Sequence, residues 1–97
     1  MEKQRAIEIV QSCAVEARRL GATLLYIFGS TARDRAGEQS DVDIFVDYDS
    51  EKFSFVELIR LRESLSQALG RPADLTTRRG VHPAIKEKIE RESIRVF

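Results

Sequence analysis

The chain has 97 residues, of which 42% are hydrophobic and 33% are charged. This is the composition of one globular domain, residues 1–97, and it excludes a disordered chain or one built from membrane-spanning helices. The single cysteine, Cys13, excludes an internal disulfide and a thiolate zinc site, and the single histidine, His82, excludes most histidine-based metal sites and catalytic triads. Carboxylates, hydroxyls and arginines remain for any chemistry.

Basic and acidic residues balance at 16 each, so the chain lacks the overall basic charge typical of nucleic-acid-binding proteins, and we expect no direct nucleic-acid binding. Residues 33–51 hold seven acidic residues and two arginines, whereas residues 78–97 hold six basic and three acidic residues. The acidic stretch either binds cations or lies in solvent, and the basic stretch either covers an acidic partner surface or forms a solvated helix face. Residues 1–5 lack the apolar stretch of a signal peptide, which predicts a cytoplasmic protein without a membrane attachment.

The first third of the chain shows a helical pattern followed by an extended one. Apolar residues at helical spacing predict one amphipathic helix over residues 2–20, which ends at Gly21 and buries Cys13 in the core. The continuous apolar run of residues 22–28 predicts a strand that is covered on both faces. A short helix is expected over residues 31–36.

Strict alternation over residues 41–48 predicts the next strand. One face carries Val42, Ile44, Val46 and Tyr48, and the other carries Asp41, Asp43, Phe45 and Asp47.

The rest of the chain repeats this order of elements. We expect a helix over residues 53–69, a short strand over 73–77, a helix that begins near Pro83 and ends about residue 91, and an extended tail over 93–97. The predicted apolar face of the first of these helices consists of Phe53, Val56, Leu58, Ile59, Arg62, Leu65 and Leu69. Three strands between helices predict an α/β domain with a small mixed β-sheet, in the order α-β-α-β-α-β-α.

Asp41 and Asp43 are the first candidates for catalytic residues. Residues i and i+2 of a strand project from the same face, roughly 6–7 Å apart, so two carboxylates there repel each other unless a cation lies between them. Mg²⁺ suits such a pair because it binds one or two carboxylates and completes its shell with water and substrate phosphates. Asp47 lies too far along the strand to join them, and Asp74 is the candidate for a third ligand.

Gly29 and Ser30 end the first predicted strand and precede the predicted short helix. A glycine there lets backbone N–H groups approach an anion closely, and a serine hydroxyl adds a further donor. The pair therefore predicts a phosphate-binding turn.

Other readings of the acidic residues fit less well. An EF-hand requires a central glycine and more oxygen ligands, but the apolar residues 44–46 follow Asp43. A P-loop requires Gly-Lys-Ser/Thr, which the chain lacks. Phosphatases that use Asp-x-Asp generally need a larger domain. The remaining alternative is that the acidic residues are solvated surface charges.

The sequence GSTAR at residues 29–33, followed by SDVDIFV at residues 40–46, resembles the minimal nucleotidyltransferases of the polymerase-β superfamily. Ten residues separate Ser30 from Asp41, as in the Gly-Ser-x10-Asp-x-Asp pattern of that family, and Asp74 matches its third carboxylate. The order of elements fits along the whole chain. One departure is Asp34, where relatives often carry glycine.

The resemblance implies that two Mg²⁺ ions bind to Asp41 and Asp43, and that Asp74 completes the metal site and takes a proton from the acceptor. It also implies that Gly29 and Ser30 hold the β- and γ-phosphates of ATP.

Two further residues belong to the predicted nucleotide site. Arg33 either pairs with a phosphate or is a surface charge, and Ser40 either orients Asp41 or is a plain turn residue.

Minimal nucleotidyltransferases of this length resemble antitoxins encoded beside a HEPN-domain ribonuclease toxin. This implies that AMP is transferred from ATP to a toxin tyrosine, within a hetero-oligomer of the two proteins. Two alternatives stay open: a non-catalytic antitoxin that neutralises the toxin by contact, and a nucleotidyltransferase that acts on a small molecule.

Overall fold

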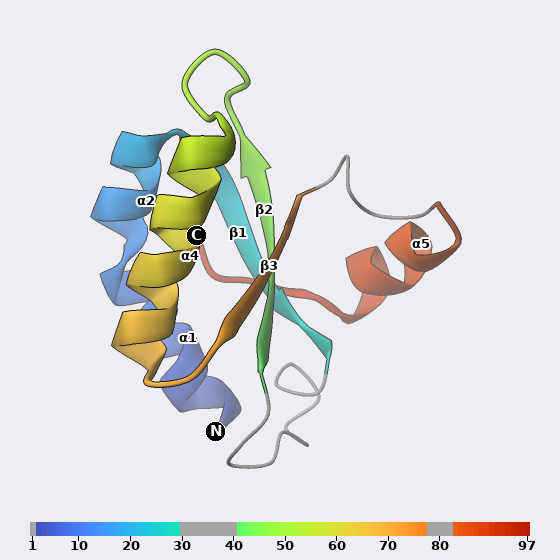
Figure 1. Ribbon diagram of the computed structural model, residues 1–97. Helices are drawn as coiled ribbons and strands as arrows, with labels where there is room; N and C mark the ends of the chain where they lie inside the picture. Colours follow the sequence, from blue (N-terminus) through green and yellow to red (C-terminus); the bar gives the residue numbers. More distant parts are fainter. Residues whose placement is uncertain (1, 30–40, 78–82) are drawn as a thin grey trace.

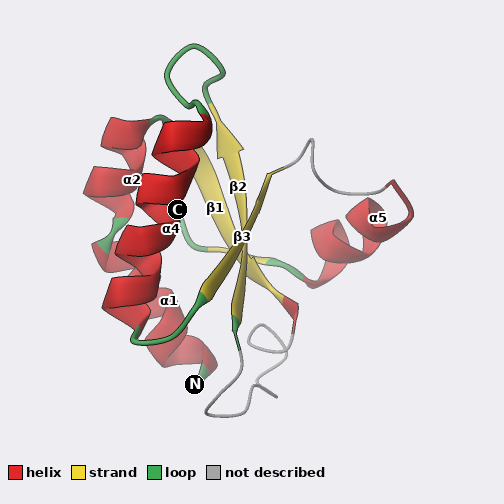
Figure 2. Ribbon diagram, in the orientation of Figure 1, coloured by secondary structure: helices red, strands yellow, loops and turns green. Residues whose placement is uncertain are grey.

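The computed structural model describes residues 2–29, 41–77 and 83–97 (Figure 1). A four-stranded mixed sheet forms its centre, in the strand order β3-β2-β1-β4. Helices α1, α2 and α4 cover one face of the sheet, and α5 lies on the other side (Figure 2). The predicted α/β class with a small mixed sheet is confirmed.

The N-terminal helical segment is broken, so the prediction of one helix over residues 2–20 was wrong. Helix α1 spans Lys3–Ser12 and α2 spans Ala14–Leu20, with Cys13 between them at φ −91° and ψ 0°. The side chains of Ser12 and Cys13 both donate to the carbonyl of Ile9, which draws that carbonyl away from the regular helical ladder. Cys13 is half-buried against the core, not fully inside it.

Strands β1 (Ala22–Phe28) and β2 (Val42–Tyr48) pair antiparallel, with Ile27 opposite Ile44. The helix-covered face of both strands is buried, whereas the other face of β1 is only partly covered. The prediction that both faces of β1 are covered was therefore wrong for its outer face. The predicted alternation of β2 is confirmed for Val42, Ile44 and Val46, which are fully buried. It is less strict than predicted, because Phe45 on the opposite face is also buried and Tyr48 is only half-buried.

Helix α4 spans Phe55–Leu69 and begins two residues later than predicted. Phe53 stacks on Tyr48, with ring centroids 4.9 Å apart, and so lies in the connection before the helix. The buried face of α4 consists of Leu61, Leu65 and Leu69.

The predicted apolar face of α4 was thus partly wrong. Arg62 is exposed, and Val56 is 54% exposed at the first turn. The packed face follows an i, i+4, i+8 row instead, which includes Leu61.

The C-terminal half adds β3 (Ala73–Thr77), α5 (Pro83–Glu92) and β4 (Ile94–Arg95). Strand β3 and the start of α5 at Pro83 agree with the prediction. Strand β4 was missed: it pairs antiparallel with β1, and the Val96 N–H donates to the Leu25 carbonyl at 2.8 Å. The tail therefore completes the sheet as its fourth strand.

The helix predicted over residues 31–36 lies outside the described residues. Within the described parts, none of the helices is long and apolar enough to cross a bilayer.

Candidate active site

Three strand ends meet at one edge of the sheet. Phe28, the last residue of β1, is the antiparallel partner of Asp43, and Asp43 is the parallel partner of Asp74. Adjacent strands lie about 4.8 Å apart, and residues paired directly across strands project from the same face. Asp43 and Asp74 are therefore neighbours on one face, next to the residue that follows β1, Gly29.

Gly29 lies against the carboxylate of Asp43. Its φ is +69°, in the left-handed region, and a Cβ built at this position would overlap Oδ2 of Asp43 and lie 3.1 Å from its Cγ. Glycine is thus required here for two reasons, the backbone conformation and the space that the carboxylate occupies. The backbone after β1 and the Asp43 carboxylate form one close-fitting unit.

Backbone hydrogen bonds fix the register between the two acidic strands. The Val42 N–H, one residue before Asp43, donates at 3.0 Å to the carbonyl of Pro72, two residues before Asp74. The Ala73 N–H donates to Oγ of Ser66 on α4 at 2.9 Å. Helix α4 therefore holds the start of β3, and β3 in turn holds Asp74 beside Asp43.

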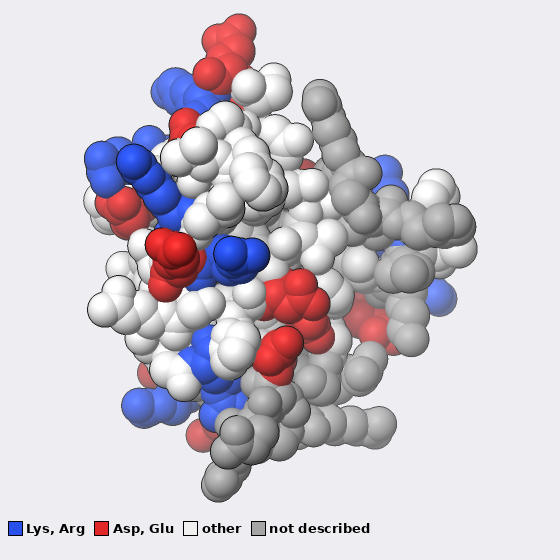
Figure 3. All heavy atoms as spheres, in the orientation of Figure 1, with Lys and Arg blue, Asp and Glu red and all other residues white. Residues whose placement is uncertain are grey.

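The carboxylates differ in exposure. Asp43 is half-buried, whereas Asp74 and Asp41, which directly precedes β2, are exposed. In Figure 3, an acidic patch lies near the centre over the sheet, and further acidic side chains lie among the basic ones over the helices. This edge therefore has one fixed carboxylate at its base and two that face solvent. Three further predicted site residues, Ser30, Arg33 and Ser40, lie outside the described residues.

The donor set suits a hard cation, because every candidate ligand is a carboxylate. In residues 2–29, 41–77 and 83–97 there is no group of three or more carboxylate, thiolate or imidazole side chains gathered so as to hold a metal ion by themselves. Mg²⁺ is commonly bound through one or two carboxylates together with substrate phosphates. The neighbouring carboxylates of Asp43 and Asp74, beside Gly29, match a Mg²⁺ site whose ligands come partly from the protein and partly from substrate phosphates.

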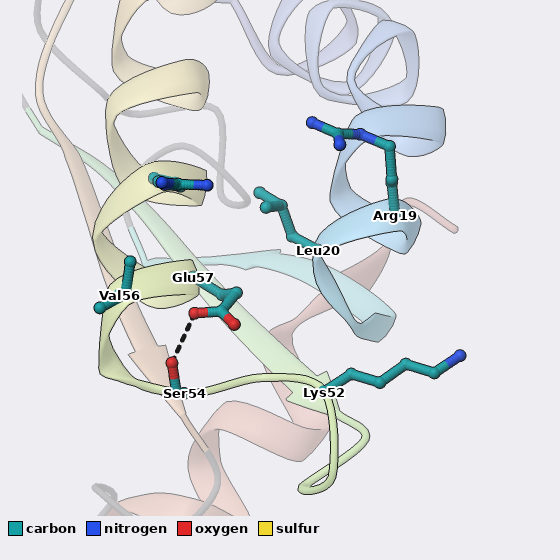
Figure 4. Close-up of a pocket in the computed structure, with 7 residues that line it drawn as sticks. Arg19, Leu20, Lys52, Ser54, Val56 and Glu57 are labelled. Carbon is teal, nitrogen blue, oxygen red and sulfur yellow. Dashed lines mark hydrogen bonds between the residues drawn. The ribbon is translucent and has the colours of Figure 1, made fainter.

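A cavity of about 460 Å³ lies at the other end of the sheet, between α2 and the start of α4 (Figure 4). It is lined by Arg19, Leu20, Lys52, Ser54, Val56, Glu57 and Arg60. The Ser54 hydroxyl, directly before α4, donates to Oε2 of Glu57 in the first turn of the helix at 2.5 Å. Since Lys52 follows the end of β2 and Asp43 lies near its beginning, this cavity is remote from the carboxylates.

A smaller cavity of about 200 Å³ lies on the carboxylate face, next to Phe45 and Tyr26. The sequence interpretation gave neither residue a role. The available signal was the aromatic side chain of Phe45 between Asp43 and Asp47, on a face that was otherwise acidic.

Comparisons with known proteins agree with this geometry. The sequence profile of the nucleotidyltransferase domain family matches residues 11–96. A relative in Methanocaldococcus jannaschii, named "putative protein adenylyltransferase", is 40% identical over 71 residues, which cover 73% of this chain and 75% of the relative.

Two solved structures share the fold. One, described as a "putative minimal nucleotidyltransferase", superposes with a TM-score of 0.77 at 33% identity and covers 97% of this chain and 95% of the other. The second is the complex of a tri-AMPylated Shewanella oneidensis HEPN toxin with an MNT antitoxin, with a TM-score of 0.65 at 18% identity, covering 98% of this chain and 71% of the other. The domain match, together with the carboxylate edge beside Gly29, leads to one assignment. This chain belongs to the nucleotidyltransferase domain family.

Proposed function

We propose that this nucleotidyltransferase transfers AMP from ATP to a tyrosine hydroxyl of a cognate HEPN ribonuclease toxin and thereby neutralises it. The observation that carries the proposal is the pairing of Asp43 with Asp74, together with the close contact between Gly29 and the Asp43 carboxylate. A phosphate-binding turn and two adjacent carboxylates are the parts that nucleotidyl transfer requires.

When bound, Mg²⁺ would neutralise charge on the triphosphate and activate the acceptor oxygen. Asp41 and Asp43 would hold the ions, with Asp74 as the third ligand. The half-buried Asp43 is the best-positioned of these ligands, because the Gly29 backbone restricts where its carboxylate can lie. Gly29 and Ser30 would hold the β- and γ-phosphates, and Arg33 and Ser40 would complete the nucleotide site.

In the transfer, the acceptor oxygen forms a bond to the α-phosphorus while the bond to the β-phosphate oxygen breaks and pyrophosphate leaves. The proton of the acceptor hydroxyl passes to a base. Asp74 suits that role because it is exposed, so an acceptor can reach it, and it neighbours Asp43.

The choice of acceptor rests on the relatives. The relative named as an adenylyltransferase points to protein modification, and the complex of an MNT antitoxin with an AMPylated HEPN toxin names a class of acceptor. An exposed carboxylate edge agrees with an acceptor that is carried on another protein, in a hetero-oligomer.

The test is to mix the purified chain with the HEPN protein of the neighbouring gene, ATP and Mg²⁺, and to measure intact mass. We expect the partner to gain one or more AMP units, located on tyrosine by peptide mapping, and Asp41→Asn to abolish the gain. Asp47→Asn is the matched control, since Asp47 lies near the far end of β2, away from the site, and it should behave like the unmodified chain. A partner of unchanged mass would overturn the proposal.

Asp41→Asn also distinguishes an antitoxin that acts by AMP transfer from one that neutralises the toxin by contact. If Asp41→Asn still neutralises the partner at stoichiometric amounts, the chain acts as a binding antitoxin. If AMP appears on small hydroxyl compounds and not on the partner, the acceptor is a small molecule.

A further inference from the structure

The 200 Å³ cavity on the carboxylate face lies between the sheet and α5. Its lining consists of Tyr26, Phe45, Ile89, Glu90 and Ser93. This volume is below the roughly 300–1,000 Å³ of pockets that enclose whole drug-sized ligands. The cavity therefore fits one ring system of a larger ligand.

The strand register places this cavity directly beside the carboxylates. Tyr26 is paired with Phe45, and the next pair on the same face is Phe28 with Asp43. Two residues along a strand advance about 7 Å. A ribose with its bonds spans a gap of this order, so a nucleotide with its phosphates at Gly29 and Asp43 can place its base in the cavity.

The walls suit an aromatic ring with a polar edge. The rings of Tyr26 and Phe45 lie 5.9 Å apart and are inclined at 58°, and the facing wall from α5 is the buried side chain of Ile89. Glu90 and Ser93 supply the polar rim, with a carboxylate that accepts hydrogen bonds and a hydroxyl that donates and accepts. Apolar faces and a polar rim are the features that bind a nucleobase.

The cavity is also well supported by the fold. The Ser93 N–H donates to the carbonyl of Ile89 at 2.8 Å, and β4 follows at once and pairs with β1, where Arg95 lies opposite Tyr26. The end of α5 is thus held against the same strand that provides the aromatic wall.

We propose that this cavity binds the base of the nucleoside triphosphate and that Glu90 and Ser93 read its edge. The proposal rests on the proposed nucleotidyl transfer and deepens it. Because the Glu90 carboxylate is only an acceptor, it favours bases with an exocyclic amino group over uracil, whose one N–H donor on the base edge lies between two carbonyl oxygens. We expect Mg²⁺–ATP to bind more tightly than Mg²⁺–UTP.

The first test compares Mg²⁺–ATP with Mg²⁺–tripolyphosphate, which lacks a base, by titration calorimetry. Ile89→Trp fills the cavity and should weaken ATP binding about tenfold or more, while tripolyphosphate binding is unchanged. The matched control is Val56→Trp, the same kind of substitution in the remote 460 Å³ cavity, which should change neither affinity. If Ile89→Trp lowers folding stability, Tyr26→Leu is the second variant, with the same expected pattern.

The second test uses the fact that the chain has two tyrosines. In NMR spectra of tyrosine-labelled protein, Mg²⁺–ATP should shift the ring resonances of Tyr26 and leave those of Tyr48 unchanged, and tripolyphosphate should shift neither. Equal ATP affinity in Ile89→Trp and the unmodified chain, with no shift of Tyr26, would overturn the base site and leave nucleotidyl transfer standing. If the unmodified chain binds neither ligand, the proposed transfer fails and the base site with it.

Discussion

The two faces of β2 make different contributions to the molecule, although they alternate residue by residue. Val42, Ile44 and Val46 are fully buried beneath the helices, whereas Asp43 and Asp47 are half-buried on the opposite face. The helix-covered face gains stability by removing apolar surface from water. The opposite face carries the candidate site at one end.

The comparison shows how a short strand combines stability and chemistry. Since neighbouring side chains point to opposite faces, Asp43 is held by the packing of Val42 and Ile44 on either side of it. Changes on the two faces should therefore have separable effects, one on activity and the other on stability.

The largest expected effect comes from the carboxylate face. Asp43→Asn should lower AMP transfer by about 10³-fold or more, because it removes the charge of the carboxylate that lies against Gly29 and that we propose as a Mg²⁺ ligand. The measurement is the initial rate of AMP incorporation into the partner, with circular dichroism as a check of folding. Asp47→Asn, on the same strand and face, should keep its rate within about twofold. Equal losses in both variants would contradict a site confined to the edge.

A glycine pair tests the close fit at that edge. Gly29→Ala introduces a Cβ that collides with the Asp43 carboxylate and strains a backbone at φ +69°, so it should cost about 1–3 kcal/mol of stability and lower Mg²⁺–ATP affinity. Gly70→Ala is the matched control, since Gly70 has φ +70° but no atom within 4 Å of the added Cβ. It should cost about 1 kcal/mol and leave affinity unchanged.

Chemical denaturation and titration calorimetry measure the two quantities separately. If Gly29→Ala and Gly70→Ala lose stability alike and both retain nucleotide affinity, Gly29 serves only the turn and not the site.

The carboxylate edge was predictable from sequence because its signals are local. Two aspartates at i and i+2 of an alternating strand, and a glycine after an apolar strand, can be read without knowing what lies beside them. Asp74 was a candidate because it lies in a short predicted strand, and the resemblance supported it. Spacing could not place it beside Asp43, since the pairing between Asp43 and Asp74 joins residues far apart in the chain.

The features that sequence reasoning missed depend on tertiary contacts. Strand β4 has two residues, too few for a recognisable pattern, and forms because β1 offers free backbone groups to Val96 and Phe97. The break at Cys13 arises where two side chains compete for the Ile9 carbonyl, while the apolar pattern continues through it. The cavity beside Phe45 exists only because α5 folds back over β1 and β2.

A conservative change on the buried face should lower stability and leave nucleotide binding intact, which is the opposite pattern to that expected for Asp43→Asn. Ile44→Val removes one methylene from a fully buried side chain and should cost about 0.5–1.5 kcal/mol of unfolding free energy. Its Mg²⁺–ATP affinity, measured below the unfolding transition, should equal that of the unmodified chain. A loss of affinity greater than the loss of stability would show that the two faces are coupled through the strand.

The smallest effect concerns a carboxylate outside the sheet. Glu16 on α2 accepts hydrogen bonds from Arg19 at 2.7 and 2.9 Å, and these bonds hold the pKa of Glu16 below its ordinary value. A lowered folded-state pKa stabilises the protein above the unfolded-state pKa, and this contribution is lost as pH falls through the folded-state pKa.

Glu16→Gln should therefore lower the thermal midpoint slightly at neutral pH, and the difference from the unmodified chain should vanish on acidification. Both residues are exposed, so solvent screening keeps the effect small. AMP transfer should be unaffected, in contrast to Asp43, because the charge of Glu16 is already matched by its neighbour, whereas Asp43 lies beside another carboxylate, Asp74. A loss of transfer in Glu16→Gln would show that activity depends on acidic charge in general and not on the pairing of β2 with β3.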